Sequence, residues 1–355
     1  MPGAVVVGTG FGARIHVPAL RNAGFDVVAL VGRDAERTER RAQRLGVPNA
    51  CATLADALAL PEADAVTIAT PPDTHAALAI EVCEAGRHVI CEKPFALDRH
   101  EARRMLDAAV RAGVTHLVGH EFRWAPDRAV VARALRDGLI GEPRMFSLVQ
   151  YVPLVAGPSA TNMPRWWYDA DRGGGWLGAS GSHVVDQIRT WLGEIESVSA
   201  VLPAVRASVE AAEDSFVVRT TTVNGAHGVL QQSAASWTPD VAGCAIVAGT
   251  MGTIEVRGTT VWLSDEAGRR ALEIPVDLAL PPAPAALEDP RERFTSLELG
   301  PYTRLCEALR SGIEGATREP AVPVPTFADG LAEMCVLDAV RLSAASGGAL
   351  TAVAV

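Results

Sequence analysis

The chain has 355 residues, a length that predicts two domains. Hydrophobic residues make up 48% of it and charged residues 21%, which is enough apolar material for sizeable cores and excludes wholesale disorder. The formal net charge of −10 argues against a nucleic-acid surface or an anionic membrane partner, because both require an excess of basic residues.

The cysteines and the hydropathy pattern bear on metal binding, cellular location and membrane insertion. The six cysteines form no CxxC pair and no metal-ligand spacing, so we expect no metal site and a reducing, cytoplasmic location. No basic N-terminal region precedes an apolar stretch, and no segment reaches about 18 uninterrupted apolar residues. We therefore expect neither a signal peptide nor a membrane span.

Short β-branched runs alternate with longer Ala- and Arg-rich helical patterns over the first 120 residues. Strands are predicted at 4–7, 25–31, 65–69, 88–91 and 115–118. Helices are predicted at 12–23, with a kink at Pro18, and at 34–45, 73–85 and 98–112, the second of them capped by Asp34. This alternation predicts an α/β domain over residues 1–121, with a doubly wound parallel sheet covered on both faces.

The pattern changes after residue 121. A helix is predicted at 126–137, a strand at 145–152, a loop at 153–175, a helix at 176–192, and several short strands between 195 and 273. A Pro- and Ala-rich loop at 275–290 and helices at 300–311 and 327–344 complete the chain. These elements predict an α+β domain over 122–355 with a large, mostly antiparallel open sheet, and we expect the last helix to pack back toward the first domain.

A glycine-rich turn follows the first strand and opens a helix. Small residues there permit a tight turn and let backbone N–H groups approach a pyrophosphate at the helix N-terminus. This context favours a dinucleotide-binding Rossmann domain over a purely structural turn. The predicted contacts are Gly8, Thr9, Gly10, Phe11, Gly12 and Ala13.

The end of the second strand bears on which dinucleotide binds. An acid there would hold the ribose 2′-OH of NAD, whereas an arginine suits the 2′-phosphate of NADP. The chain places Gly32 at the acid's position and Arg33 directly after it, with Arg37 one helical turn further on. We therefore predict NADP in preference to NAD. The alternative is that Asp34 replaces the acid and the arginines form a solvated helix face.

Lysine occurs once in this sequence, at Lys93, although the chain uses arginine freely. Lys93 follows a predicted strand within Glu92-Lys93-Pro94, at the sheet edge where ligands of parallel sheets bind. An amine there can hydrogen-bond a substrate oxygen and stabilise charge on it during hydride transfer. The alternative is an ordinary surface lysine at a strand end.

A second glycine-rich segment, Gly173-Gly174-Gly175, leads into a helix that carries His183. Histidine titrates near neutrality and suits proton exchange with a hydroxyl group. Asp186 follows three residues later on the same helical face, where it either orients the imidazole or is a solvated charge. We expect His183 to be catalytic with Asp186 in support.

Together these motifs resemble the family of glucose–fructose oxidoreductase, inositol dehydrogenase and MocA. The segments that carry the likeness are residues 8–12, 70–75, 92–94, 119–126, 167–169, 173–186 and 329–330. The resemblance implies hydride transfer between a nicotinamide and a carbohydrate-like alcohol or ketone, with further cofactor contacts from Thr70, Pro71, His75, Glu92 and Lys93. It also implies a homodimer or homotetramer formed through the open sheet.

One position departs from the family pattern, and the substrate clues are few. The family often has an aspartate four residues before the catalytic histidine, but this chain has Ala179. The substitution puts the substrate class in question more than the fold. Aromatic residues at 166–168 suggest a substrate pocket or, alternatively, packing beneath a loop. We also predict substrate contacts from His120 and Arg123, which follow the last strand of the first domain, and from Arg165, which could meet an anionic group. The aromatic residues predicted to contact substrate are Trp167 and Tyr168.

Three functions remain open from the sequence. The preferred one is an NADP(H)-dependent oxidoreductase that interconverts a secondary alcohol and a ketone of a sugar, polyol or related cyclic substrate. The second is a redox-neutral enzyme that uses a bound nicotinamide transiently for elimination or hydrolysis. The third is a dinucleotide-binding sensor without catalysis, which Ala179 favours and Lys93 and His183 oppose.

Overall fold

The computed structural model describes the whole chain apart from residues 158–162, 206–211, 240, 282–294, 317–319 and 355. It forms two compact units. Unit 1 comprises Met1–Ala96, His100–Ala125 and Leu280–Leu331, and unit 2 comprises Leu97–Arg99, Pro126–Ala279 and Ala332–Val355. The sequence predicted continuous domains on either side of residue 121, whereas the chain returns to unit 1 after residue 279. Its return helix α8 (Thr295–Ile313) packs against α1 (Val17–Asn22), and it buries Tyr302 and Leu305 in the same core as Leu20.

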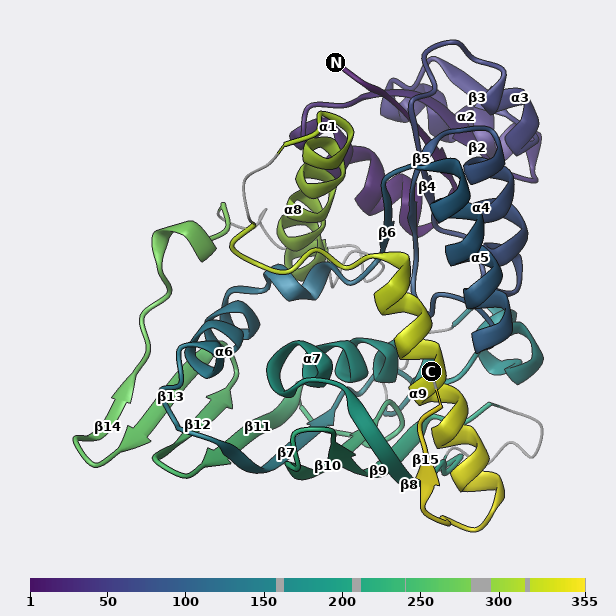
Figure 1. Cartoon of the computed structure of the whole chain (residues 1–355). Coiled ribbons are helices and arrows are strands. Elements are labelled where there is room, and N and C mark those ends of the chain that lie inside the picture. The colour runs from purple at the N-terminus through teal and green to yellow at the C-terminus, as the bar shows by residue number, and fades with distance from the viewer. Residues whose placement is uncertain (158–162, 206–211, 240, 282–294, 317–319, 355) are drawn as a thin grey trace. The chain divides into compact units, whose positions relative to one another are not determined.

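Unit 1 is built on a six-stranded sheet (Figure 1), in the order β3-β2-β1-β4-β5-β6, and every neighbouring pair is parallel. The strands are β1 (Gly3–Val7), β2 (Asp26–Val31), β3 (Asn49–Cys51), β4 (Ala65–Ile68), β5 (His88–Cys91) and β6 (His116–Val118). All residues of β1 and β4 are buried, as expected for central strands covered on both faces. The predicted doubly wound parallel sheet is confirmed.

Local sequence explains where the helices of unit 1 begin and end. The Asp34 carboxylate accepts a hydrogen bond from the Arg37 backbone N–H and caps α2 (Ala35–Leu45), which ends at the left-handed Gly46. The helix predicted at 12–23 is instead a π-helical turn η1 (Gly12–His16) followed by α1, with Pro18 in the first turn of α1. Proline lacks the N–H that a continuous α-helix would need at that point.

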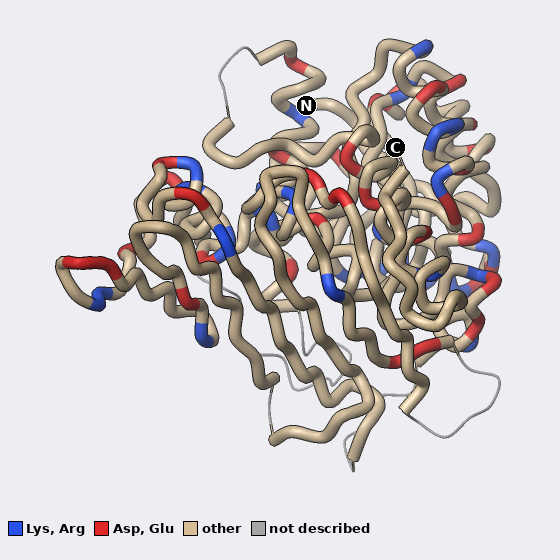
Figure 2. Tube along the Cα trace, turned by 60° about the horizontal axis from the view of Figure 1, so that its bottom comes forward, with Lys and Arg blue, Asp and Glu red and all other residues tan. Residues whose placement is uncertain are grey.

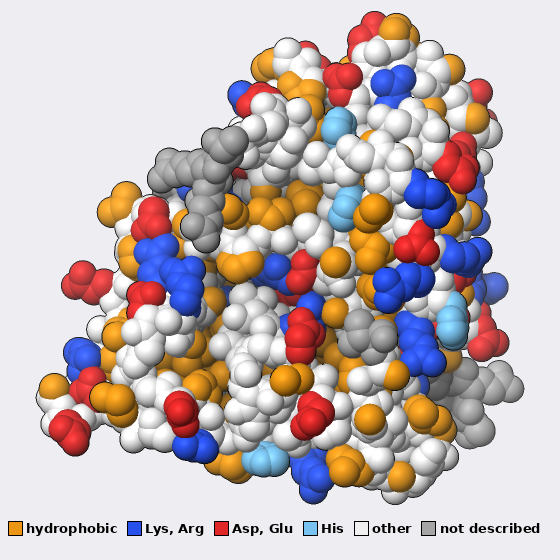
Figure 3. Space-filling view, in the orientation of Figure 1, with side chains coloured by type: hydrophobic (Ala, Val, Ile, Leu, Met, Phe, Trp, Pro, Cys, Tyr) orange, Lys and Arg blue, Asp and Glu red, His pale blue; other side chains and the backbone are white. Residues whose placement is uncertain are grey.

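The remaining helical elements of unit 1 lie along the sheet and after its last strand. They are α3 (Leu54–Leu58), η2 (Pro72–Thr74), α4 (His75–Glu84), η3 (Glu121–Trp124) and α5 (Arg99–Ala112), whose first residue belongs to unit 2. The sequence did not predict β3 and α3, because runs of three and five residues are too short to show a period. In Figure 3 the outer surface of α4 and α5 carries basic and acidic side chains side by side, as a solvated helix layer does.

Unit 2 contains a nine-stranded sheet in the order β14-β13-β12-β11-β7-β10-β9-β8-β15. Only β10 and β7 pair in parallel, so the prediction of a mostly antiparallel sheet is confirmed. The strands are β7 (Pro143–Tyr151), β8 (Ile195–Val201), β9 (Ser215–Thr222), β10 (His227–Ser233), β11 (Ala242–Gly249), β12 (Gly252–Arg257), β13 (Thr260–Asp265), β14 (Gly268–Ala271) and β15 (Thr351–Ala352).

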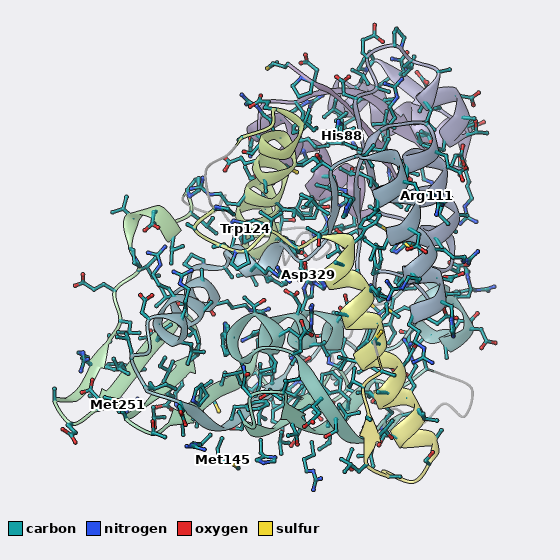
Figure 4. All side chains as sticks on the ribbon, in the orientation of Figure 1. His88, Arg111, Trp124, Met145, Met251 and Asp329 are labelled. Carbon is teal, nitrogen blue, oxygen red and sulfur yellow. The ribbon has the colours of Figure 1, made fainter. Side chains whose placement is uncertain are left out.

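Helices cover one face of this sheet. Figure 1 shows α6 (Pro126–Arg136) and α7 (Ser182–Leu192) on the same side of the strands. The helix predicted at 176–192 is a π-helical turn η6 (Leu177–Gly181) that continues into α7. The opposite face is turned forward in Figure 2, where the central strands carry few charged side chains. Met145, which is 58% exposed, points to that uncovered side in Figure 4.

The other elements of unit 2 are short, except for the final helix. They are η4 (Arg165–Tyr168), η5 (Ala170–Arg172), η7 (Val276–Leu278) and α9 (Phe327–Ala345), whose first turn belongs to unit 1. The predicted loop at 275–290 contains η7, and its residues 282–290 lie outside the described part of the chain. Across the described residues, no helix combines the length and the apolar character that a membrane span requires.

Candidate functional site

The glycine-rich turn after β1 is shaped by close contacts on one side and open space on the other. Gly8 has a φ of +119°, and a Cβ there would lie 2.3 Å from the Ala69 carbonyl oxygen. A Cβ on Gly12 would lie 2.8 Å from Val6 Cγ1, which lets η1 pack closely on the sheet. Gly10 is exposed and has no heavy atom within 4 Å of its Cβ position. This cradle fits the pyrophosphate of a dinucleotide at the start of η1.

The end of β2 leaves no room for an acidic side chain. A Cβ on Gly32 would lie 2.5 Å from both Thr38 Oγ1 and Thr9 Cγ2. The Asp34 carboxylate, which could have replaced the acid, accepts the Arg37 N–H at 3.0 Å as the cap of α2. Arg33 and Arg37 are both exposed, and the Arg37 Nε lies 3.7 Å from an Asp34 carboxylate oxygen.

Lys93 is half-buried directly after β5 and interacts with the buried Glu92, which pairs with His16. The Glu92 carboxylate lies 3.2 Å from His16 Nε2, and the His16 ring stacks on the Tyr302 ring at 4.3 Å between centroids. Burial raises the pKa of Glu92, but the hydrogen bond from His16 and the charges of His16 and Lys93 outweigh it, and the net pKa is lowered. Glu92 is therefore an anion that faces the only amine side chain of the protein.

Two further carboxyl groups, Glu121 and Glu298, interact electrostatically with Lys93, and the sequence reasoning missed both. Burial and the charge of Glu92 raise the pKa of Glu121 well above its usual value. Burial raises the pKa of Glu298, on α8, to about 7, although the nearby Arg14 and Lys93 charges oppose the rise. Because α8 lies more than 200 residues away in the chain, no sequence spacing could have placed Glu298 here.

His75 connects the turns that follow β4 and β5. Its ring is fully buried, with Nε2 2.9 Å from the Thr70 carbonyl oxygen and Nδ1 3.1 Å from that of Pro94. Burial lowers its pKa. The Thr70 and Pro71 side chains are half-buried at the turn itself. His75 was predicted as a cofactor contact, but its burial gives it a different place: it joins the Thr70 turn to the backbone beside Lys93.

Of the two residues predicted after β6, one is committed to an ion pair. Arg123 is buried, and its guanidinium donates to Asp329 at 2.8 Å and to the Pro323 carbonyl at 3.2 Å. The Asp329 carboxylate also accepts a hydrogen bond from the Thr326 N–H, just before α9. Figure 4 labels Asp329 in the first turn of this helix. Arg123 therefore fixes the chain before α9, and the predicted substrate contact is not the role its partners indicate. His120 is 1% exposed.

In unit 2, a half-buried glutamate, Glu213, holds the second glycine-rich segment in front of the helix that carries His183. A Cβ on Gly175 would lie 2.2 Å from Glu213 Oε1, and the same carboxylate accepts the Leu177 N–H at 3.0 Å. This contact holds the start of η6, which continues into α7. His183 and Asp186 are 7% and 3% exposed on α7. The predicted pair therefore lies on one well-anchored helix.

The aromatic segment before η6 divides between packing and exposure. Trp167 is 2% exposed, its carbonyl accepts the Gly175 N–H, and its ring meets Tyr168 edge-on at 5.1 Å. Arg165 is exposed and Tyr168 is half-buried. Trp167 is thus a buried side chain of this segment, and its contact with substrate stays a prediction.

A chain of side-chain hydrogen bonds near His183 was not predicted. Ser180 Oγ donates to Gln232 Oε1 at 2.7 Å, and Gln232 Nε2 donates to Gln150 Oε1 at 2.8 Å. The sequence feature that could have indicated it is a glutamine at a strand position that otherwise faces the apolar core, as Gln150 and Gln232 do. Among the described residues, no group of three or more His, Cys, Asp or Glu side chains could hold a metal ion.

Comparison with known proteins identifies the family. Residues 3–120 match the model of the oxidoreductase family with an NAD-binding Rossmann fold, and residues 129–255 match that of the GFO/IDH/MocA C-terminal domain. The two models together cover more than half of the chain. The chain belongs to the GFO/IDH/MocA family of oxidoreductases.

Two curated relatives illustrate the likeness. The D-apiose dehydrogenase of Paraburkholderia graminis is 32% identical over 240 residues, which cover 65% of this chain and 60% of that protein. The levoglucosan dehydrogenase of Pseudarthrobacter phenanthrenivorans is 34% identical over 169 residues, or 47% and 43% of the two chains. The chain thus spans about half the length of the curated relatives it matches.

A solved structure extends the likeness over the whole fold. The WlbA dehydrogenase of Bordetella pertussis, in complex with NADH and UDP-GlcNAcA, is 25% identical with a TM-score of 0.80. The superposition covers 99% of this chain and 98% of that one. The GFO/IDH/MocA architecture therefore extends beyond the two matched segments.

Proposed function

We propose that the protein is an NADP(H)-dependent oxidoreductase that interconverts a secondary alcohol and a ketone of a sugar, polyol or related cyclic compound. The observation that carries the proposal is the placement of Lys93. The one lysine of the chain follows β5 at the carboxyl edge of an NAD-binding Rossmann sheet, against a buried Glu92–His16 pair. An arginine at this place could supply a charge, but it could not share a proton with an oxygen atom in the same way.

The cofactor is proposed to bind along the ends of β1, β2 and β4. Its pyrophosphate would be held by backbone N–H groups of Gly10–Ala13, and the Thr70–Pro71 turn would line its nicotinamide side. When bound, the nicotinamide supplies or accepts a hydride at C4. The cradle described for Gly8, Gly10 and Gly12 supports this assignment.

The preference for NADP is proposed from Gly32, Arg33 and Arg37. An acid at position 32 would repel a 2′-phosphate, and the structure has no room there for any side chain without moving Thr9 and Thr38. Two exposed guanidinium groups can bind the phosphate with a fork of donors. The test compares kcat/KM for NADPH and NADH in the wild type and in Arg33→Ser. We expect the ratio to fall at least tenfold in the variant, and a wild-type preference for NADH would refute the proposal.

Lys93 and His183 are proposed to act on the reacting oxygen atom. The Lys93 ammonium donates a hydrogen bond to that oxygen and stabilises negative charge on it. His183 gives a proton to the oxygen in reduction and accepts one in oxidation. Asp186, on the next turn of α7, is proposed to support the imidazolium form.

The substrate class is proposed from the relatives. The two curated relatives act on D-apiose and levoglucosan by their names, and both compounds are polyhydroxylated rings or their open forms. Tyr168, Arg165 and His120 remain candidates for substrate contact. We propose the same class for this chain.

The deciding experiment is a dehydrogenase screen with both cofactors over levoglucosan, D-apiose, myo-inositol and aromatic diols. Lys93→Met and His183→Ala should each lower kcat at least a hundredfold on the best substrate. His227→Gln, an exposed histidine on β10, is the matched control and should keep its rate. If both active-site variants retain near wild-type turnover, the assigned roles are wrong. A purified protein that holds a dinucleotide tightly but turns over none would favour the redox-neutral alternative.

The proposed oligomeric state rests on the uncovered sheet face of unit 2, and the proposed cellular location rests on the cysteines. The uncovered face of the nine-stranded sheet exposes Met145 and Val229. We propose that a second copy of the chain covers this face in a homodimer or homotetramer, which light scattering on the purified protein would test. The six cysteines lie within the described residues and form no disulfide bond there, which supports the proposed cytoplasmic location.

A further inference from the structure

The inner face of the unit 2 sheet is interrupted by two glutamines at its centre. Inward positions of β7 otherwise carry apolar side chains, such as Phe146 and Leu148, which are buried. Gln150 continues that inward series, and it pairs in register with Gln232 on β10. Side chains directly opposite each other on paired strands lie on the same face. The two amides are therefore neighbours beneath the helix layer.

The two sides of the Gln150–Gln232 pair differ in exposure: the β11 side is exposed, and the β9 side is covered by η6. On β11, Gly243 is the register partner of Gln150 and is exposed. A Cβ there would lie 2.5 Å from the Val149 carbonyl oxygen and 3.2 Å from Gln150 Cβ, so the strands approach closely beside Gln150. On the other side, η6 lies over the pair, because a Cβ on Gly181 would lie 3.3 Å from the ring of Phe216, the partner of Gln232 on β9. Gln150 thus lies between the part of the inner sheet face that η6 covers and the part that is exposed to solvent.

The hydrogen bonds among Ser180, Gln232 and Gln150 connect the covered part of this face with the exposed part. They run from Ser180 through the buried Gln232 to Gln150, while the ends at Ser180 and Gln150 are half-buried. With these bonds made, Gln150 retains two amide N–H donors and Ser180 retains acceptor capacity at Oγ. Reversing both amides reverses the direction of the chain, so each end can either donate or accept.

We propose that Ser180, Gln232 and Gln150 form a binding subsite for hydroxyl groups of the substrate, on the same helix run as His183. A hydroxyl group both donates and accepts, which matches ends that can do the same. The subsite carries no charge, so it favours neutral polyols over anionic sugars. Ala179, next to Ser180, offers no hydrogen-bonding side chain, so Ser180 is the polar contact on this turn. This inference rests on the proposed function, whose substrate class it deepens.

The test measures binding separately from turnover. Isothermal titration of the NADPH-loaded protein with levoglucosan, D-apiose and myo-inositol gives Kd values for the wild type, Gln150→Leu and Ser180→Ala. Loss of a neutral hydrogen bond to the ligand raises the Kd of each probe about tenfold. The double variant should lose less than the product of the two single losses, because both act through Gln232.

Gln231→Leu is the matched control. Gln231 is the neighbouring residue on β10, and its amide donates to the Tyr151 hydroxyl at 2.8 Å on the opposite face of the sheet. Its variant should keep wild-type Kd values. The inference is overturned if the Gln150 and Ser180 variants bind the probes as the wild type does, if Gln231→Leu loses as much, or if the wild type binds none of the probes. Probes that bind through this subsite but are never oxidised would support it and refute the proposed function alone.

Discussion

Replacement of Glu298 by glutamine should remove a specific pH dependence of stability. Glu298 lies on α8, its side chain is 17% exposed, and its carboxylate is 3.4 Å from the Arg14 guanidinium. Burial raises the pKa of Glu298 from its ordinary 4.5 to about 7. Arg14 keeps a hydrogen bond to Thr295 Oγ1 at 3.0 Å when the carboxylate is removed, so the substitution does not strand the guanidinium.

The raised pKa of Glu298 sets the sign and the size of its effect on the free energy of unfolding. The folded state binds this proton more tightly than the unfolded chain, so the contribution of Glu298 to stability is greatest below pH 4.5 and falls as the pH rises toward 7. A rise of 2.5 pKa units corresponds to about 3 kcal/mol, of which about 2 to 3 kcal/mol is lost between pH 5 and pH 8. Glu298→Gln has no proton to lose there, so its advantage over the wild type should grow by that amount across this range.

The assay is urea unfolding of the protein without cofactor at pH 5, 6, 7 and 8, with hydrogen exchange of α8 amides to locate the effect. Glu307→Gln is the control on the same helix, because its side chain is 42% exposed and pairs with Arg304 at the surface. The control should follow the wild-type pH profile. Parallel profiles for Glu298→Gln and the wild type would refute the reasoning, since they would mean that Glu298 is not protonated in the folded state near neutrality.

Further substitutions in the glycine-rich turn, at Asp34 and at Arg123 test other parts of the account. Gly8→Ala should lower the free energy of unfolding by at least about 2 kcal/mol, because it combines a φ of +119° with a Cβ placed against the Ala69 carbonyl. Gly10→Ala, in the same turn, should change it by less than about 0.5 kcal/mol and instead weaken NADPH binding in a fluorescence titration. Asp34→Ala should cost about 1 kcal/mol in urea unfolding through loss of the α2 cap, and Asp34→Asn should restore most of it. Arg123→Met should cost about 3 kcal/mol by leaving Asp329 without its buried partner, whereas an unchanged unfolding midpoint would show that the ion pair does not hold α9.

Periodicity and local chemistry determined most of unit 1 in advance. The β-branched runs, the Asp34 cap and the glycine turn after β1 each act over a few residues, so the sequence contains the whole cause. The same holds for the sheet of unit 2, where short strands separated by turns predicted an antiparallel arrangement. The six-residue glycine motif and the lone Lys93 likewise stand out without any knowledge of the fold.

Tertiary structure decided what depends on contacts between distant segments. The sequence could not show that α8 returns to unit 1, that Glu298 lies near Lys93, or that Arg123 pairs with Asp329, because each contact joins residues some 200 positions apart. It also could not distinguish His75 as a buried link between two turns from a residue that touches a ligand. Strand register alone brought Gln150 and Gln232 together. Burial and pairing are properties of the folded chain, and a linear pattern records only which side chains are available for them.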